Sequence, residues 1–257
     1  MSTVQLSIEG QIARIFINRA DKHNALTQSM WQQISDYCDQ LSNTSNIKVL
    51  IISAAGEKAF CAGADISELT EIIHDESRLI ANNKVVQQAQ LTLQKLPFPT
   101  IAAINGACIG GGMGIALCCD FRIAVEHAKF GITPSKLGLL YSIEDTKRVT
   151  DLLGVARAKE LLYIGKIITA SQANDWGLLT SLVAASELDN VVNELVQQVL
   201  SVSSFSTSGV KKTIEYVTGT VAHDETDVRS MFNQAFANQD FIEGANAFLA
   251  KRPAKFK

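Results

Sequence analysis

Short apolar segments alternate with longer stretches of mixed polarity along the first half of the chain. Residues 4–8 alternate between apolar and polar side chains, and residues 12–17 follow after a Glu9-Gly10 turn, so this stretch predicts an opening β-hairpin. The apolar run at residues 49–52 is typical of a strand that is covered on both faces, and residues 100–104 predict a buried strand. Residues 121–125 and 179–184 predict two further strands.

Helical periodicity separates these strands. Thr27 is a suitable N-cap for a helix whose apolar side chains share one face. Residues 67–96 are predicted to be mainly helical, and residues 115–119 begin another helix after a glycine-rich turn. From residue 187 onward the pattern predicts helices alone, at residues 190–200, 210–218, 223–237 and 241–250.

This order of elements predicts an α/β protein, because strands and helices alternate before the helical end. We therefore expect an α/β core over residues 1–195 and a C-terminal helical region over residues 196–257. A helical region of this kind packs on its own core or on a neighbouring subunit.

Composition and charge exclude several classes of protein. Apolar residues make up 47% of the chain, and the net charge of −3 provides no drive toward nucleic acid or an anionic membrane. The five cysteines include no Cys-x-x-Cys pair, and no histidine has metal-like spacing, so we expect no disulfide framework and no metal site. Without a signal-like start or an apolar run of roughly 20 residues, the expected location is cytoplasmic, with no membrane partner.

The most distinctive stretch is the glycine-rich turn over residues 105–114, Asn-Gly-Ala-Cys-Ile-Gly-Gly-Gly-Met-Gly. It lies between a predicted strand and a predicted helix, so several backbone N–H groups are left unpaired around one point. The helix dipole adds partial positive charge there, which suits an anion or a developing oxyanion. The alternative is a tight strand-to-helix turn that binds nothing.

A second glycine-containing loop, over residues 60–66, changes the balance between these alternatives. Its sequence, Phe-Cys-Ala-Gly-Ala-Asp-Ile, follows a predicted buried strand and offers another backbone N–H. Two N–H donors from separate loops are the minimum for an oxyanion hole.

Five motifs in order along the chain resemble those of the crotonase (enoyl-CoA hydratase/isomerase) superfamily. They lie at residues 18–26, 60–66, 99–120, 170–178 and 243–253. The resemblance implies a crotonase-type (ClpP-like) core of repeated ββα units in a spiral, with a C-terminal helical trimerisation region. It also implies a homotrimer or a dimer of trimers, and a coenzyme A thioester that is substrate and not a bound cofactor.

The same resemblance assigns roles to individual residues. The two oxyanion donors fall at Ala64 and Gly111. The residues implied to cradle coenzyme A are Asn24, Ala25, Ala62, Asp65 and Ile66.

The chain departs from the family at the two glutamates that its hydratases use. The corresponding positions are Gly114 and Ser135, and neither supplies a carboxyl group for acid/base work near neutral pH. We therefore do not expect an ordinary two-glutamate hydratase. Glu144 is a candidate for a displaced acid/base; the alternative is that Glu144 and Asp145, in the first turn of a helix, only interact favourably with the helix dipole.

A local resemblance suggests another reaction. Residues 133–141, Thr-Pro-x-x-Leu-Gly-x-x-Tyr, are similar to a stretch of methylmalonyl-CoA decarboxylase in which the tyrosine contacts the substrate carboxylate. Loss of carbon dioxide generates an enolate without a general base, which would give Tyr141 a role, although the decarboxylase has a histidine where this chain has Ala64. Tyr141 is alternatively a packing aromatic whose hydroxyl bonds to backbone.

The expected function is an enoyl-CoA hydratase/isomerase family enzyme, a lyase or an isomerase, that acts on acyl-CoA through an enolate held in an oxyanion hole. The alternatives are an acyl-CoA decarboxylase and a non-catalytic acyl-CoA binder.

Overall fold

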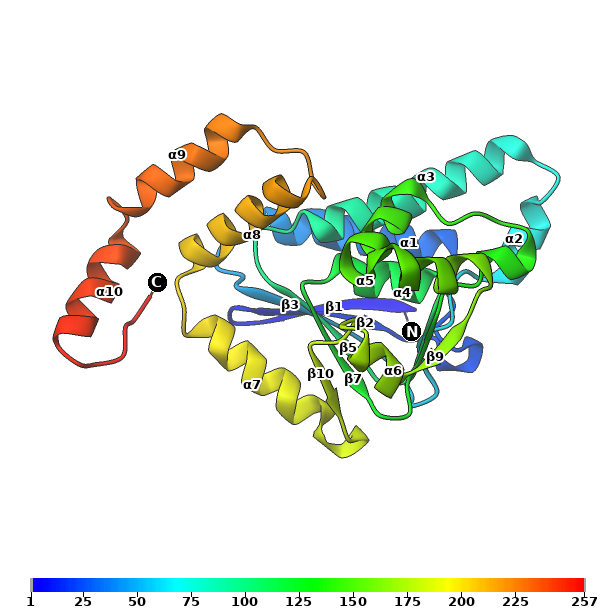
Figure 1. Cartoon of the computed structure of the whole chain (residues 1–257), viewed down its shortest axis with the longest axis horizontal. Helices are drawn as coiled ribbons and strands as arrows, with labels where there is room; N and C mark the ends of the chain where they lie inside the picture. Colours follow the sequence, from blue (N-terminus) through cyan, green and yellow to red (C-terminus); the bar gives the residue numbers. More distant parts are fainter. Residues whose placement is uncertain (1, 257) are drawn as a thin grey trace.

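Two β-sheets lie at the centre of the molecule, with helices around them (Figure 1). This computed structural model describes residues 2–256. The larger sheet has six strands in the order β1-β2-β3-β5-β7-β10, and the smaller has four in the order β4-β6-β8-β9. The first two strands, β1 (Val4–Glu9) and β2 (Ile12–Ile17), form the antiparallel hairpin that the sequence predicts.

Between residues 49 and 163 the chain repeats a unit of strand, strand and helix. The first strand of each unit joins the larger sheet and the second joins the smaller one, and equivalent strands of successive units are parallel neighbours. The first strands are β3 (Val49–Ala54), β5 (Thr100–Ile104) and β7 (Phe121–Val125), and the second strands are β4 (Ala59–Cys61), β6 (Ala107–Ile109) and β8 (Lys129–Gly131). The repeated ββα spiral is thereby confirmed.

The short strands of the smaller sheet are where the sequence prediction was wrong. β4 overlaps the glycine-containing loop predicted over residues 60–66, and β6 lies inside the glycine-rich turn. Three residues are too few to show a period of two, so alternation could not reveal these strands. β9 (Ile167–Thr169) completes this sheet antiparallel to β8, and β10 (Ser181–Val183) completes the larger one beside β7.

Side-chain caps decide where the helices begin. The α1 helix (Gln28–Ser42) starts after Thr27, whose Oγ1 accepts a hydrogen bond from the Met30 N–H at 3.3 Å, as predicted. The stretch predicted as mainly helical before Pro97 is divided in two, because Asp75 caps a new helix start. The two helices are α2 (Ile66–Ile72) and α3 (Glu76–Gln94).

The second half of the chain is mainly helical. Its α-helices are α5 (Ile143–Tyr163), α6 (Ala170–Asp175), α7 (Leu188–Leu200), α8 (Ser204–Thr218), α9 (Glu225–Ala235) and α10 (Gln239–Leu249), and it has the short 3-10 helices η2 (Pro134–Leu137) and η3 (Ala185–Glu187). A further 3-10 helix, η1 (Ala20–Lys22), lies between β2 and α1. α7 packs against β3, β5 and β7 and crosses the predicted boundary at residue 195, whereas α9 and α10 lie away from the sheets (Figure 1). Within residues 2–256, no helix has the length and apolar character needed to span a bilayer.

Candidate functional site

Two glycine-containing loops meet at the start of α4 (Gly111–Cys118). A Cβ atom added to Gly63 would lie 3.6 Å from the Gly111 amide nitrogen and 3.3 Å from the Ile109 carbonyl oxygen. Gly63 has a φ of 109°, a backbone conformation that favours glycine. The two loops that the sequence predicts around one point are therefore in contact.

The Ala64 N–H is held by a single parallel bridge. The Leu26 N–H donates to the Gly63 carbonyl at 2.8 Å, and the Asp65 N–H donates to the Leu26 carbonyl at 2.9 Å. In such a bridge the N–H of the residue between the two bonds points to the opposite side. Among residues 2–256 no acceptor takes the Ala64 N–H, so it is available to a ligand.

The Gly111 N–H is the first of α4, and a first helical residue has no acceptor inside its own helix. Gly110, with a φ of 52°, turns the chain into this helix. A Cβ on Gly112 would collide with the Cys61 carbonyl oxygen, so the helix start lies directly against β4. Within residues 2–256, two N–H groups without an acceptor therefore come from touching loops, which is the minimum that an oxyanion needs.

The early loop over residues 18–26 is braced by Asn24. Its side-chain amide donates to the carbonyls of Ala55 and Ala59 at 2.9 and 2.7 Å, and its Oδ1 accepts from the Arg19 N–H at 3.0 Å. Asn24 is buried. Its side chain shapes the loop, so any contact with a coenzyme there falls to the loop backbone and its neighbours.

Asp65 joins the early loop to the glycine-containing loop over residues 60–66. Its Oδ2 accepts from Arg19 Nη1 at 2.6 Å, and its Oδ1 accepts from the backbone N–H groups of Ser67 and Glu68 at the start of α2. The hydrogen bond from Arg19 is the main reason that the pKa of Asp65 is lowered. Among the other residues predicted to cradle coenzyme A, Ala62 and Ile66 are exposed and Ala25 is half-buried.

Tyr141 contacts the glycine-rich turn, whereas Glu144 does not. The Tyr141 hydroxyl donates to the Gly110 carbonyl oxygen at 3.1 Å. Burial, with the charge of Asp145, raises the pKa of Tyr141, so the phenol stays a neutral donor. Glu144 is exposed in the first turn of α5, and its carboxylate has no hydrogen-bond partner within residues 2–256.

A buried polar cluster lies beside Gly114, where α3, α4 and α5 meet. Asp145 Oδ2 accepts from Gln90 Nε2 at 3.1 Å, and Asp145 Oδ1 accepts from Arg148 Nη1 at 2.9 Å. Arg148 Nε donates to Gln94 Oε1 at 2.8 Å. A Cβ on Gly114 would collide with Gln90 Nε2 and come within 3.5 Å of Asp145 Oδ1. These side chains therefore fill the space that a residue larger than glycine would need.

Sequence reasoning missed this cluster and considered Asp145 only for the helix start. The Asp145 N–H does take part there, because it donates to Ser142 Oγ at 3.0 Å. The carboxylate, however, is turned inward, and burial raises its pKa while Arg148 partly opposes that effect. The signal in the sequence was a glycine at position 114 in place of a carboxylate, together with an aspartate that had no other assignment.

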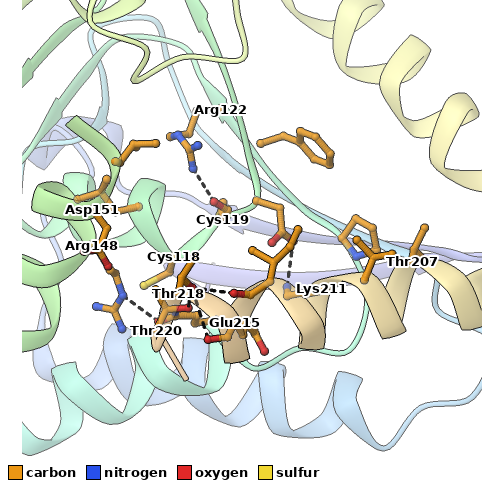
Figure 2. Close-up of a pocket in the computed structure, with 18 of the residues that line it drawn as sticks. Cys118, Cys119, Arg122, Arg148, Asp151, Thr207, Lys211, Glu215, Thr218 and Thr220 are labelled. Carbon is orange, nitrogen blue, oxygen red and sulfur yellow. Dashed lines mark hydrogen bonds and ion pairs between the residues drawn. The ribbon is translucent and has the colours of Figure 1, made fainter. Parts of the chain in front are cut away.

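A cavity of about 620 Å³ lies between α8 and the end of α4, and neither Ala64 nor Gly111 is among the residues that line it. Figure 2 shows Arg148, Cys118 and Lys211 around it. Arg148 borders this cavity from α5 while it pairs with Asp145, so the polar cluster separates the cavity from Gly114.

Comparison with known proteins identifies the class of protein that has this fold and these loops. Residues 7–257 match the family model described as enoyl-CoA hydratase/isomerase. The chain is 33% identical to the short-chain-enoyl-CoA hydratase of Clostridium acetobutylicum, over 98% of this chain and 96% of that protein. It is also 33% identical to the crotonyl-CoA hydratase of Syntrophomonas wolfei, with the same coverage of 98% and 96%.

A solved structure agrees with these sequence matches. The crystal structure of an enoyl-CoA hydratase/isomerase family protein from Hyphomonas neptunium has a TM-score of 0.94 and 37% identity, and the alignment covers 100% of this chain and 98% of that one. The chain belongs to the enoyl-CoA hydratase/isomerase family, as its motifs predict. The comparisons do not show the local resemblance to methylmalonyl-CoA decarboxylase.

Proposed function

We propose that this protein binds an acyl-CoA thioester and stabilises the enolate formed from it, with the Ala64 and Gly111 N–H groups donating to the thioester oxygen. The observation that supports this most directly is the pair of unpaired N–H groups on two loops in contact. An enolate oxygen carries more negative charge than a thioester oxygen. Donors held in place therefore lower the energy of the enolate more than that of the substrate.

The coenzyme end of the substrate is proposed to lie along the early loop and the glycine-containing loop over residues 60–66. The Leu26–Ala64 bridge and the Arg19–Asp65 ion pair hold these two loops together. The exposed Ala62 and Ile66 would then contact coenzyme A, with Ala25, while Asn24 and Asp65 keep the loops in shape.

The proposed reaction is a proton transfer at an acyl chain, of lyase or isomerase type, without the pair of glutamates used for hydration. Gly114 and Ser135 supply no carboxyl group, and Gln90 and Asp145 occupy the space beside Gly114. The Tyr141 hydroxyl donates to Gly110, so geometry lends no support to decarboxylation assisted by Tyr141. Glu144 stays a predicted acid/base, and a non-catalytic acyl-CoA binder is the alternative that turnover assays test.

The C-terminal helices are proposed to mediate a homotrimer or a dimer of trimers. Phe232 on α9, Phe236 just after it and Phe241 on α10 form a chain of edge-to-face contacts, although each residue is more than half exposed. Apolar surface of this kind favours burial against another protein surface.

A pair of substitutions at Gly111 tests the oxyanion hole. Gly111→Pro removes the N–H at a position where a helix accepts proline, and Gly111→Ala adds the same Cβ against Trp31 but keeps the N–H. We expect Gly111→Pro to lower the rate of α-proton exchange of 3-enoyl-CoA in deuterated water by about 10²–10³-fold relative to Gly111→Ala. Mass spectrometry of the recovered thioester measures the exchange.

Equal rates for the two variants would show that the Gly111 N–H does not hold the enolate. The same assay with crotonyl-CoA and methylmalonyl-CoA separates hydration and decarboxylation from double-bond migration. Tight binding of all three thioesters without turnover would favour the non-catalytic binder.

A further inference from the structure

We propose that Asp145, presented from α5, is the carboxyl group that exchanges protons with the acyl chain, in place of the carboxylates that positions 114 and 135 lack. This inference rests on the acyl-CoA site proposed above and adds to it the proton-transferring group and the class of reaction. It makes Asp145 the acid/base in preference to its exposed neighbour Glu144.

The position of Asp145 follows from two observations on the segments where α5 and α4 begin. Tyr141, just before α5, donates to the Gly110 carbonyl at 3.1 Å, so the start of α5 lies over the turn that carries the Gly111 donor. Asp145 Oδ1 lies 3.5 Å from the place of a Cβ on Gly114, one helical turn beyond Gly111. The carboxylate therefore lies beside the same first turn of α4 that presents the proposed oxyanion donor.

The partners of Asp145 hold the carboxylate in one orientation. Gln90 donates to Oδ2 and Arg148 to Oδ1, and Arg148 is itself held by Gln94 on α3. Gln90 approaches the backbone of Gly114 so closely that no Cβ fits between them. Glycine at position 114 is thus what admits this arrangement, and its lack of a side chain is linked to the carboxylate on α5.

The surroundings of Asp145 favour a carboxyl group that both gives and takes a proton. The ionisable groups that face it are Arg148 on its own helix, Tyr141 before that helix and Cys118 on α4. Burial raises the pKa of Asp145. The charge of Arg148 and the hydrogen bonds that Arg148 and Gln90 donate to the carboxylate limit this rise. A carboxyl with a pKa closer to neutrality is a better acid/base under physiological conditions.

The balanced reaction for such a single acid/base is migration of a double bond. The Asp145 carboxylate takes a proton from the α-carbon of a 3-enoyl-CoA: the C–H bond breaks, an O–H bond forms, and the electron pair moves to the thioester oxygen. The protonated Asp145 then returns the proton to the γ-carbon, the double bond lies between the α- and β-carbons, and the carboxylate is restored. No water or co-reactant is consumed, so the expected substrate class is a 3-enoyl thioester.

The test uses 3-butenoyl-CoA in deuterated buffer with the full-length protein. Asp145→Asn is compared with Asp151→Asn, a matched change on the same helix at a surface carboxylate that pairs with Lys147. We expect Asp145→Asn to lower deuterium incorporation and formation of 2-butenoyl-CoA by about 10²–10⁴-fold, with acyl-CoA affinity within about twofold of wild type. Asp151→Asn is expected to stay within about twofold in both.

Three outcomes would overturn the inference while leaving the proposed binding site intact. The first is an Asp145→Asn variant that binds acyl-CoA and exchanges protons within about tenfold of wild type. The second is loss of exchange in Glu144→Gln with exchange kept in Asp145→Asn. The third is a wild-type protein that binds 3-butenoyl-CoA but neither exchanges a proton nor forms 2-butenoyl-CoA. Failure of the wild type to bind any acyl-CoA would instead overturn the proposed function.

The wild-type pH profile keeps the inference testable in the event that Asp145→Asn does not fold. We expect the exchange rate to rise with pH through one ionisation in the range above the ordinary aspartate pKa of 3.8, and Asp145→Glu to retain part of the rate. A profile that is flat through this range, or loss of all exchange in a folded Asp145→Glu variant that binds acyl-CoA, would contradict the role.

Discussion

One half of the candidate site is made of backbone and the other of side chains, and the two halves depend on the sequence in different ways. Ala64 and Gly111 contribute N–H groups that hydrogen bonds and close glycine packing hold in place. Asp145 depends instead on Gln90 and Arg148, which come from two helices. A fold can therefore keep polarising a thioester while a single substitution removes the proton-transferring group or allows another helix to supply it.

Arg148→Met should have the largest effect on the side-chain half of the site, because it leaves a buried carboxylate without its cation. We expect a loss of about 3–5 kcal/mol in the free energy of unfolding, measured by denaturant titration. Lys147→Met, on the same helix, removes an exposed ion pair with Asp151 and should cost at most about 1 kcal/mol. Equal losses for the two variants would show that the Asp145–Arg148 pair does not stabilise the side-chain half of the site.

Gly114→Glu tests whether a carboxyl group at position 114 is enough to give the activity of a two-glutamate hydratase. The new side chain would collide with Gln90 and displace its contact with Asp145. We expect a loss of about 1–3 kcal/mol in stability and no crotonyl-CoA hydration, as measured by unfolding and by absorbance of the unsaturated thioester. Gly114→Ala is the control, since it introduces the collision without the carboxyl group. Hydration gained in Gly114→Glu alone would contradict this prediction.

Asp65→Ala should have the smallest effect on the free energy of unfolding. Its pH dependence distinguishes Asp65, which holds the loops together, from Asp145 in the side-chain half of the site. Loss of the α2 cap is expected to cost about 1 kcal/mol near pH 7. The folded-state pKa of Asp65 lies below its ordinary value of 3.8, so its contribution is present above pH 3.8 and is lost as the pH falls. Unfolding titrations near pH 7 and below pH 3.8 measure the difference between wild type and variant, which should shrink in acid.

The contribution of Asp145 to stability should change with pH in the direction opposite to that of Asp65. Its folded-state pKa is raised, so ionisation of Asp145 lowers the stability of the fold: the stability that this carboxyl contributes is greatest below its ordinary pKa of 3.8 and falls as the pH rises above that value. In the same titrations, a gap between wild type and Asp145→Asn that moves with pH in the same direction as that of Asp65→Ala would contradict this assignment.

The parts of the fold that the sequence predicted are those with a local signal. The β1–β2 hairpin, the Thr27 cap and the helices after residue 187 each depend on a pattern or a cap within a few residues. The strands of the smaller sheet have three residues each, and their order is set by pairing between distant segments. The break in the helix predicted over residues 67–96 could not be predicted for a different reason. Asp75 caps a new helix start inside a stretch that has no other helix stop signal.

The candidate site also has parts that the sequence could predict and parts that it could not. The two glycine loops could be recognised because their motifs are contiguous. The Gln90–Asp145 contact joins residues 55 positions apart, and no spacing rule connects a glutamine on one helix with an aspartate on another. Tyr141 was assigned two possible roles, and its hydrogen bond to Gly110 matches the packing role.

The Leu26–Ala64 bridge and the Gly63–Gly111 contact have a consequence for how the protein acquires its site. These residues belong to three segments that β3 and β5 separate along the chain. Contacts between distant segments form late in folding, because closing long loops costs entropy before the contacts compensate for it. The proposed thioester binding should therefore appear after the helices have formed, and ligand binding would report completion of the fold.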